Sequence, residues 1–150
     1  MKERFKTPTA GFLILTRKNG SETEVLLQLR QNTGFKDGFW DAAASGHVEA
    51  NESVRDSIVR EAKEEIGITI LKENLEFAGF YYNNIDFVIY CYVYFHGSQY
   101  SGLPYIAEPH KCSDLKWFNI KNLPKNIIPD RKKAIENYFS NIYFGEFGWE

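Results

Sequence analysis

Residues 46–68 read GHVEANESVRDSIVREAKEEIGI, and this stretch decides the fold. A glycine is followed six positions later by a glutamate, and then by the spacing Arg-Glu-x-x-Glu-Glu-x-Gly that ends at Gly67. Ser53, with Asp56 three residues on, fits a capping box, so the pattern predicts a helix that begins near Val54. Gly67 can adopt the left-handed conformation that closes a helix, which predicts a helix of roughly three to four turns.

Three glutamates of the predicted helix share one face. At about 100° per residue, Glu61 and Glu65 lie roughly 40° apart, and Glu64 lies roughly 60° to their other side. The acidic face is therefore expected to look into a cleft. A separate stripe able to pack against a sheet holds the apolar residues Val54, Ile58, Val59, Ala62 and Ile66.

Carboxylates gathered on one face indicate a metal site. Like charges held close together repel one another unless a cation lies among them. Carboxylate oxygens suit Mg²⁺, which takes one or two protein carboxylates and keeps its other positions for water and substrate phosphate. The pattern predicts metal-assisted phosphoryl chemistry, with Mg²⁺ as the cofactor and Mn²⁺ as a substitute.

The stretch resembles the signature of the Nudix (MutT-like) hydrolase family. The resemblance implies an α/β fold, the Nudix α/β/α sandwich with a central mixed β-sheet, in which the motif forms a loop-helix-loop. It also implies hydrolysis of a nucleoside diphosphate linked to another moiety. Ala62 and Ile68 fill the two apolar slots of the signature, and its seven fixed positions are matched by Gly46, Glu52, Arg60, Glu61, Glu64, Glu65 and Gly67.

The resemblance implies a set of metal ligands. Glu61 and Glu65 correspond to the principal ligands, and Glu64 corresponds to a glutamate that often joins them. The backbone carbonyl of Ser45, just before the motif glycine, is expected to complete the site. The motif glycines Gly46 and Gly67 are expected to have structural roles.

The resemblance also implies catalytic roles. Arg60 is expected to orient the glutamates, and Glu52 corresponds variously to a helper ligand, a water-mediated contact or a partner of that arginine. The general base varies across the family, between a motif glutamate and an acidic residue of a later loop, for which Glu108 is the candidate here. The predicted catalytic set is Glu52, Arg60, Glu61, Glu64 and Glu108.

Candidates for substrate binding lie outside the motif. Arg30 and Lys36 precede it, where a cation can clamp substrate phosphate, although a plain surface charge fits the same pattern. Trp40 and Tyr90 are aromatic candidates for stacking on a base. The tail YFGEFGW is too apolar for a disordered end, so we expect it either to close the pocket or to pack in a dimer.

Alternating strands and helices are predicted along the rest of the chain. Asn19-Gly20 signals one hairpin turn, and a second strand pair is expected around Asn83-Asn84. A second helix is predicted from about residue 130 to 143. The predicted strands cover residues 11–17, 24–29, 75–82, 86–95 and 115–120.

Composition favours one domain, residues 1–150, since 150 residues can bury a real core. A hydrophobic content of 43% with 25% charged residues is typical of globular proteins. A net charge of −2 offers no basic field for long nucleic acids, so a small nucleoside diphosphate derivative is the expected partner. A homodimer is expected only because the family often forms one.

Two cysteines without close spacing predict neither a zinc site nor a disulfide framework, which fits a reducing cytoplasm. The N-terminal segment holds only a short apolar run, far below the roughly 20 residues that span a bilayer. We therefore predict a cytoplasmic protein without a membrane partner.

Several functions remain open within the resemblance. The segment WDAAASGHVE is similar to a subgroup that includes isopentenyl diphosphate isomerases, but those enzymes need a cysteine ahead of the motif, and none precedes Cys91. Residues 108–149 resemble small bacterial hydrolases often assigned to nucleoside triphosphates, including oxidised ones, which yield a monophosphate and pyrophosphate. Nucleotide sugars, dinucleoside polyphosphates and coenzyme diphosphates stay open.

A non-catalytic nucleotide sensor is the alternative from another class. Sensors of this kind tend to have lost a motif glutamate and to carry a DNA-binding appendage. Every motif carboxylate is present in this sequence, and no helix-turn-helix segment is left over. The sequence therefore favours an enzyme.

Overall fold

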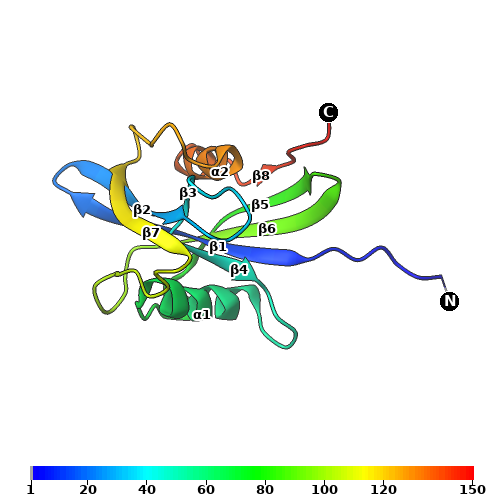
Figure 1. The fold of residues 1–150 in the computed structure, drawn as a ribbon, viewed down its shortest axis with the longest axis horizontal. Coiled ribbons are helices and arrows are strands. Elements are labelled where there is room, and N and C mark those ends of the chain that lie inside the picture. The colour runs from blue at the N-terminus through cyan, green and yellow to red at the C-terminus, as the bar shows by residue number, and fades with distance from the viewer. Residues whose placement is uncertain (1) are drawn as a thin grey trace.

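A mixed β-sheet lies between two helices that cover its opposite faces (Figure 1). The computed structural model describes residues 2–150. The helices are α1 (Val54–Ile66), α2 (Pro129–Phe139) and the 3₁₀ turn η1 (Lys72–Asn74). The strands are β1 (Thr9–Asn19), β2 (Glu22–Arg30), β3 (Trp40–Ala42), β4 (Ala44–His47), β5 (Glu76–Ile85), β6 (Val88–Gly97), β7 (Cys112–Asn119) and β8 (Phe144–Gly145). The predicted α/β/α sandwich is confirmed.

The long strand β1 organises the sheet. The strand order is β3-β2-β1-β6-β5-β8, with β4 paired to β1 and β7 paired to β2. β1 runs parallel to β6 and antiparallel to β2 and β4, so the sheet is mixed. None of the helices within residues 2–150 is long and apolar enough to cross a membrane.

Side chains from both faces of β1 are buried because a helix covers each face. Leu13 and Leu15 pack in the cluster that includes the apolar side of α1. Phe12 and Ile14 pack in the other cluster, which includes residues of α2. Successive residues of a strand point to opposite faces, so one strand supplies both cores.

Helix α1 begins and ends where the sequence predicts. Ser53 Oγ accepts a hydrogen bond from the Asp56 backbone N–H at 3.1 Å, and the Asp56 carboxylate accepts one from the Ser53 N–H at 3.2 Å. Gly67 closes the helix at φ 70°, a conformation that favours glycine. The apolar stripe packs on the sheet through Ile58, Ala62 and Ile66, and Glu61, Glu64 and Glu65 line a cavity beside the helix.

The position of the β5–β6 turn differs from the prediction. The turn lies at Asp86-Phe87, at φ 51° and 69°, and not at Asn83-Asn84, which continue β5. Asn83 is buried, and its Oδ1 accepts a hydrogen bond from the Phe147 backbone N–H at 3.0 Å. A long-range contact has therefore overridden the local turn preference of the asparagines.

The C-terminal helix and tail also differ from the prediction. Helix α2 ends at Phe139 and not near residue 143, because Asn141 adopts a left-handed φ of 59° and the Ile142 N–H returns to the Asn137 carbonyl at 2.8 Å. The tail then adds β8 beside β5, parallel to it. Phe147 stacks on Tyr81 with ring centroids 5.4 Å apart, so the tail packs on its own sheet and not over the pocket.

Phe87→Gly is predicted to stabilise the fold. Both turn residues have left-handed φ values, which cost about 1–2 kcal/mol for a side-chain-bearing residue. The Phe87 side chain is 96% exposed, so its removal forfeits little packing. We expect the free energy of unfolding to rise by about 0.5–1 kcal/mol in urea titrations.

Phe5→Gly is the matched control, because Phe5 is also exposed but is not among the residues with positive φ. We expect no gain in stability from that variant. A Phe87→Gly protein less stable than the parent chain would show that the ring makes a contact that its exposure conceals.

Candidate active site

The motif glycine allows α1 to approach β4 closely. Gly46 pairs with Gly11 of β1, so β4 fixes its position. A Cβ on Gly46 would lie 2.5 Å from the Glu61 carboxyl carbon, closer than real Cβ atoms approach any neighbour. Only glycine leaves room for the Glu61 carboxylate against the strand, which gives the predicted structural role of Gly46 a physical basis.

Glu65 is the most enclosed of the motif carboxylates. Gln28 Nε2 donates to its Oε1 at 2.7 Å, and the Ser45 backbone N–H donates to its Oε2 at 3.2 Å. Burial raises the pKa of Glu65 well above its usual value, and the adjacent Glu61 carboxylate raises it further. A divalent cation beside both carboxylates would counter both effects.

Arg60 joins the remaining acidic groups of the motif. Its Nη2 and Nε donate to the two Glu52 oxygens at 2.8 and 3.2 Å, and its Nη1 donates to Glu61 at 2.8 Å and Glu64 at 3.3 Å. The hydrogen bond from Arg60 lowers the pKa of Glu52, while that same bond raises the pKa of Arg60. This is the geometry that an orienting role for Arg60 requires.

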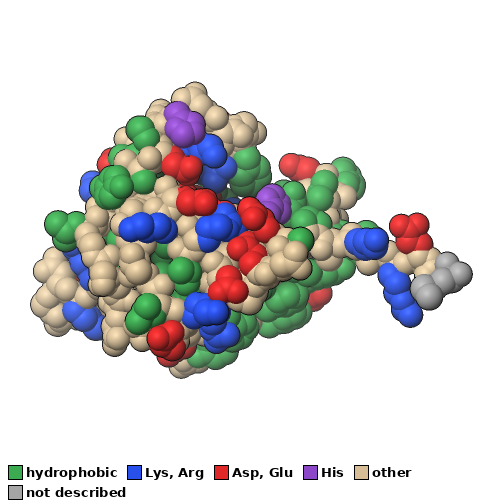
Figure 2. Space-filling view, turned by 90° about the horizontal axis from the view of Figure 1, so that it is seen from below, with side chains coloured by type: hydrophobic (Ala, Val, Ile, Leu, Met, Phe, Trp, Pro, Cys, Tyr) green, Lys and Arg blue, Asp and Glu red, His purple; other side chains and the backbone are tan. Residues whose placement is uncertain are grey.

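The acidic side chains gather on the face that carries α1. Figure 2 shows Asp and Glu side chains grouped around Lys or Arg side chains near the middle of this face. Within residues 2–150, no three His, Cys, Asp or Glu side chains form a ready metal-binding cluster. Ion pairs hold the carboxylates of Glu61 and Glu64 on Arg60.

A divalent metal nevertheless fits the donor set. The neighbouring carboxylates of Glu61 and Glu65 offer hard oxygen donors, of which the second is buried and makes no ion pair with a cation within residues 2–150. Glycine at position 46 keeps side-chain atoms out of the space beside them. The metal roles of Glu61, Glu64, Glu65 and the Ser45 carbonyl stay predictions.

A late loop forms part of the wall of the acidic cleft. The backbone N–H groups of Tyr105 and Ala107 donate to carbonyls at the end of α1, each at 3.1 Å, which holds the loop against the helix. Glu108 and Lys111 consequently line the same cavity of about 590 Å³ as the motif glutamates. The predicted general base and the Lys111 cation therefore share the cleft.

A second, aromatic cavity continues from the acidic cleft. Its volume is about 470 Å³, and it shares Arg30, Ser45, Gly46 and His47 with the acidic cleft. Its aromatic lining comes from Phe12, Phe35, Tyr90 and Tyr92. Rings beside a charged cleft offer a face on which a base can stack.

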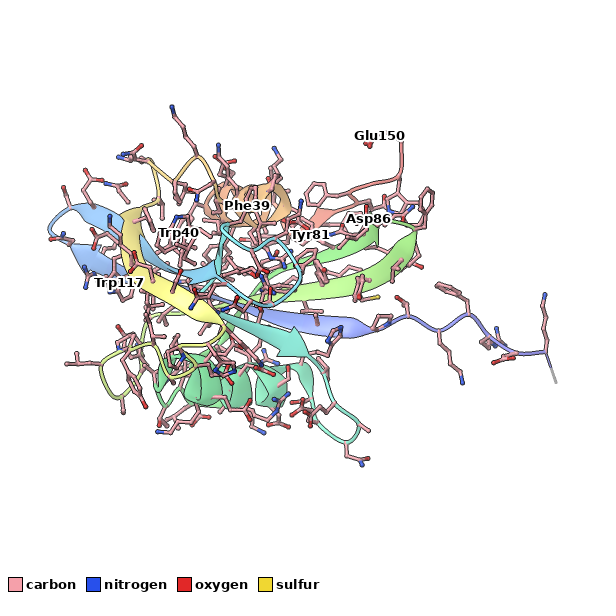
Figure 3. The ribbon with its side chains drawn as sticks, viewed as in Figure 1. Phe39, Trp40, Tyr81, Asp86, Trp117 and Glu150 are labelled. Carbon is pink, nitrogen blue, oxygen red and sulfur yellow. The ribbon has the colours of Figure 1, made fainter. Side chains whose placement is uncertain are left out.

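Two of the four predicted substrate-binding residues reach these cavities. Arg30 lines both cavities, with its Nη1 on Asp41 at 2.8 Å and its Nε on the Phe35 carbonyl at 2.7 Å, and Tyr90 lines the aromatic cavity. Lys36 is exposed and lines neither of the two. Trp40, labelled in Figure 3, is a core residue whose ring packs edge-on against Phe118.

Several residues that line the two cavities or support their walls were not predicted from the sequence. Gln28 and Asp41 carry no local signal, because their partners are distant in the chain. Arg131 looked like an ordinary residue of a second helix, yet it is only 3% exposed and lines the aromatic cavity. His47 could have been predicted as a cavity residue from the sequence, because it directly follows the motif glycine.

Comparison with known proteins identifies the family. A model described as the NUDIX domain matches residues 6–138. The chain belongs to the NUDIX family. The resemblance predicted from the motif is thus confirmed, and by family the chain is a Nudix hydrolase.

Curated relatives match this chain over only part of their own length. The protein named NAD-capped RNA hydrolase NudC from Pseudomonas aeruginosa PAO1 is 35% identical over 120 residues, covering 80% of this chain and 39% of that protein. A protein named putative nudix hydrolase 1 from Caenorhabditis elegans is 32% identical over 121 residues, covering 77% and 30%. The chain therefore spans two fifths or less of the length of these relatives.

Solved structures share the fold. A MutT/nudix family protein from Enterococcus faecalis superposes with a TM-score of 0.79 at 22% identity, covering 94% of this chain and 64% of that one. The NUDIX domain of Shewanella oneidensis NrtR, solved with ADP ribose, gives 0.74 at 18% identity, covering 92% and 90%. At these identities the likeness establishes the α/β/α architecture alone.

Gln28→Leu is predicted to weaken metal binding. The change removes the donor that holds Glu65, and loss of such a supporting partner costs roughly 10–100-fold in metal affinity. Millimolar Mg²⁺ should raise the melting temperature of the parent chain, because it binds the native carboxylates. We expect a much smaller rise in Gln28→Leu, measured by thermal unfolding with and without Mg²⁺.

Gln99→Leu, at an exposed glutamine outside the cleft, is the control and should retain the full metal response. An unchanged Mg²⁺ response in Gln28→Leu would mean that Glu65 does not need this hydrogen bond to take part in metal binding.

Proposed function

We propose that this chain catalyses the Mg²⁺-dependent hydrolysis of a phosphoric anhydride bond in a nucleoside diphosphate derivative. The observation that carries the proposal is the continuity of the acidic cleft with the aromatic cavity through Arg30 and residues 45–47. A substrate with its base among the rings places its phosphate chain over the glutamates of α1. The names of the curated relatives, which are hydrolases, support the reaction class.

The residues of the cleft have separate proposed roles in metal binding and orientation. Glu61, Glu65 and the Ser45 carbonyl would hold Mg²⁺, joined by Glu64, and the metal when bound neutralises charge on the phosphate oxygens. Arg60 holds Glu61 in place by a 2.8 Å hydrogen bond. Because mobile ligands bind metal poorly, this bond orients the site as well as balancing its charge.

Groups on the late loop and on β2 act on the substrate and the water. Glu108 lines the same cleft as the glutamates of α1, where its carboxylate can take the proton of the attacking water. Lys111 and Arg30 line the same cleft and supply N–H donors to phosphate oxygens. Arg30 is already oriented by Asp41, so its guanidinium is held ready for substrate.

Nucleoside triphosphates are the leading substrate class, with a nucleoside monophosphate and pyrophosphate as products. An aromatic cavity of about 470 Å³ is large enough for one base and its sugar. The adjoining acidic cleft of about 590 Å³ suits a chain of phosphates. Modified nucleotides, including oxidised ones, belong to the same proposal because they place the same groups in the same cavities.

A coenzyme diphosphate is the second candidate. The relatives named NAD-capped RNA hydrolase favour a dinucleotide in which a diphosphate joins two nucleosides. The neighbour solved with ADP ribose points to the same kind of molecule. Nucleotide sugars and dinucleoside polyphosphates carry the same linkage and remain within this second class.

A single domain over residues 1–150 and a cytoplasmic location complete the proposal, with a small molecule and no long nucleic acid as the partner of the site. The net charge of −2 supports the last point. A homodimer remains part of the proposal because the family often forms one.

A Mg²⁺-dependent substrate screen tests the proposal. Purified protein is offered triphosphates, oxidised nucleotides, nucleotide sugars, dinucleoside polyphosphates and coenzymes, and the products are separated by chromatography. Monophosphate with pyrophosphate is expected from a triphosphate, whereas two phosphorylated halves would mark a cleaved diphosphate bridge and favour the second class.

Glu65→Gln separates an enzyme from a nucleotide sensor. The variant keeps the side-chain shape but removes a charge, and we expect kcat/KM to fall about 100-fold or more, since metal ions supply several kcal/mol of charge stabilisation. Folding should be retained, because a neutral amide costs less free energy to bury than the Glu65 carboxylate that it replaces. Glu73→Gln, at an exposed glutamate of η1, should keep full activity. Unchanged turnover in Glu65→Gln would contradict the proposed site.

A further inference from the structure

A buried arginine lines the aromatic cavity, far from the motif in sequence. Arg131 lies in the first turn of α2 and is only 3% exposed, yet it forms part of the cavity lining. Its guanidinium carbon lies 4.4 Å from the centroid of the Phe12 ring and 5.2 Å from that of Tyr92. A cation is therefore placed among the rings proposed to stack on a base.

Two carboxylates fix this arginine. Arg131 Nε donates to Asp41 Oδ1 at 2.8 Å, and Nη1 donates to the Asp130 carboxylate at 3.2 Å. Asp41 is fully buried, and its other oxygen holds Arg30 at 2.8 Å. The positive charges of Arg30 and Arg131 are balanced by the negative charges of Asp41 and Asp130. The part of a ligand that enters the aromatic cavity therefore need not be negatively charged.

The N–H donors of Arg131 that Asp41 and Asp130 do not use suit a neutral hydrogen-bond acceptor. Arginine carries five N–H donors, and the contacts to Asp41 and Asp130 do not use Nη2. Burial raises the pKa of the Tyr92 phenol, and the positive charge of the Arg131 guanidinium beside the ring opposes that rise. Tyr92 thus stays protonated and adds an O–H donor to the same wall of the cavity.

We propose that Arg131 makes the cavity selective for 6-oxopurine nucleotides, those of guanine and hypoxanthine, over 6-aminopurine nucleotides. The inference rests on the proposed function and names the base of its substrate. Guanine presents O6 and N7 as acceptors to an arginine, whereas adenine presents an amino group at the 6 position. An amino group facing buried N–H and O–H donors is left without a partner, which a closed site penalises.

Asp86 adds a matching acceptor at the mouth of the cavity. It lies at the tip of the β5–β6 hairpin (Figure 3) and lines the same cavity. Guanine carries N1–H and N2–H₂ donors on the edge that follows O6, and a carboxylate can accept from them. Its exposed position makes Asp86 the weaker determinant, because water competes for it.

Binding of hydrolysis-resistant nucleotides tests the selectivity. The probes are the α,β-methylene analogues of GTP, ITP and ATP with Mg²⁺, titrated by calorimetry into the parent chain and Arg131→Lys. Lysine keeps a charge for Asp41 but lacks the planar fork. We expect the GTP and ITP analogues to bind about tenfold more tightly than the ATP analogue, and this ratio to fall to about twofold in Arg131→Lys.

Arg55→Met is the matched control. Arg55 is also an arginine over an aromatic ring, 4.6 Å from the Phe95 centroid, but it lies outside the cleft, and its loss should leave the ratio unchanged. A ratio of affinities does not depend on the folded fraction, so a partly unfolded variant still gives an answer.

Three results would overturn the inference: equal affinity for the three analogues, no binding of any of them, or an Arg131→Lys protein with the parent ratio. The proposed hydrolysis is judged separately, by product formation in the substrate screen. A chain that selects the GTP analogue but hydrolyses no compound of the screen would support the inference and remove the proposed reaction.

Discussion

Two carboxylates held side by side against a glycine are the constraint on which this structure depends. Glu61 and Glu65 project from adjacent turns of α1 towards β4, and the absence of a side chain at Gly46 allows them to approach the strand. Such a pair repels itself in a partly buried site, so it persists only with compensation. Gln28 and Arg60 provide that compensation within the protein, and a divalent cation would complete it.

A second buried charge ties the acidic cleft to the aromatic cavity. Asp41 holds Arg30 with one oxygen and Arg131 with the other, each at 2.8 Å. Coulombic attraction from these arginines keeps the pKa of Asp41 below its usual value, although burial opposes them as the largest single influence. The arginine proposed to bind phosphate and the arginine proposed to face the base therefore share one anchor, Asp41.

Helix α1 was predicted correctly because its sequence signals act locally. The capping box at Ser53, the apolar stripe and the stop at Gly67 all act within α1, so they could be recognised without tertiary contacts. The second strand pair was predicted correctly, but the position of its turn was wrong for the opposite reason: Asn83 prefers a turn, but its side chain accepts a hydrogen bond from the backbone of Phe147, 64 residues away. The Asp41–Arg131 pair spans 90 residues and leaves no pattern in the sequence.

The central claim is that the acidic cleft and the aromatic cavity act on one substrate. A crystal structure with Mn²⁺ and the α,β-methylene analogue of GTP tests it most directly, since anomalous scattering locates the metal. The account predicts a Mn²⁺ peak within coordination distance of the Glu61 and Glu65 carboxylates, the phosphate chain beside it, and the base against Phe12 and Arg131. A metal bound elsewhere, or a base outside the aromatic cavity, would contradict the account.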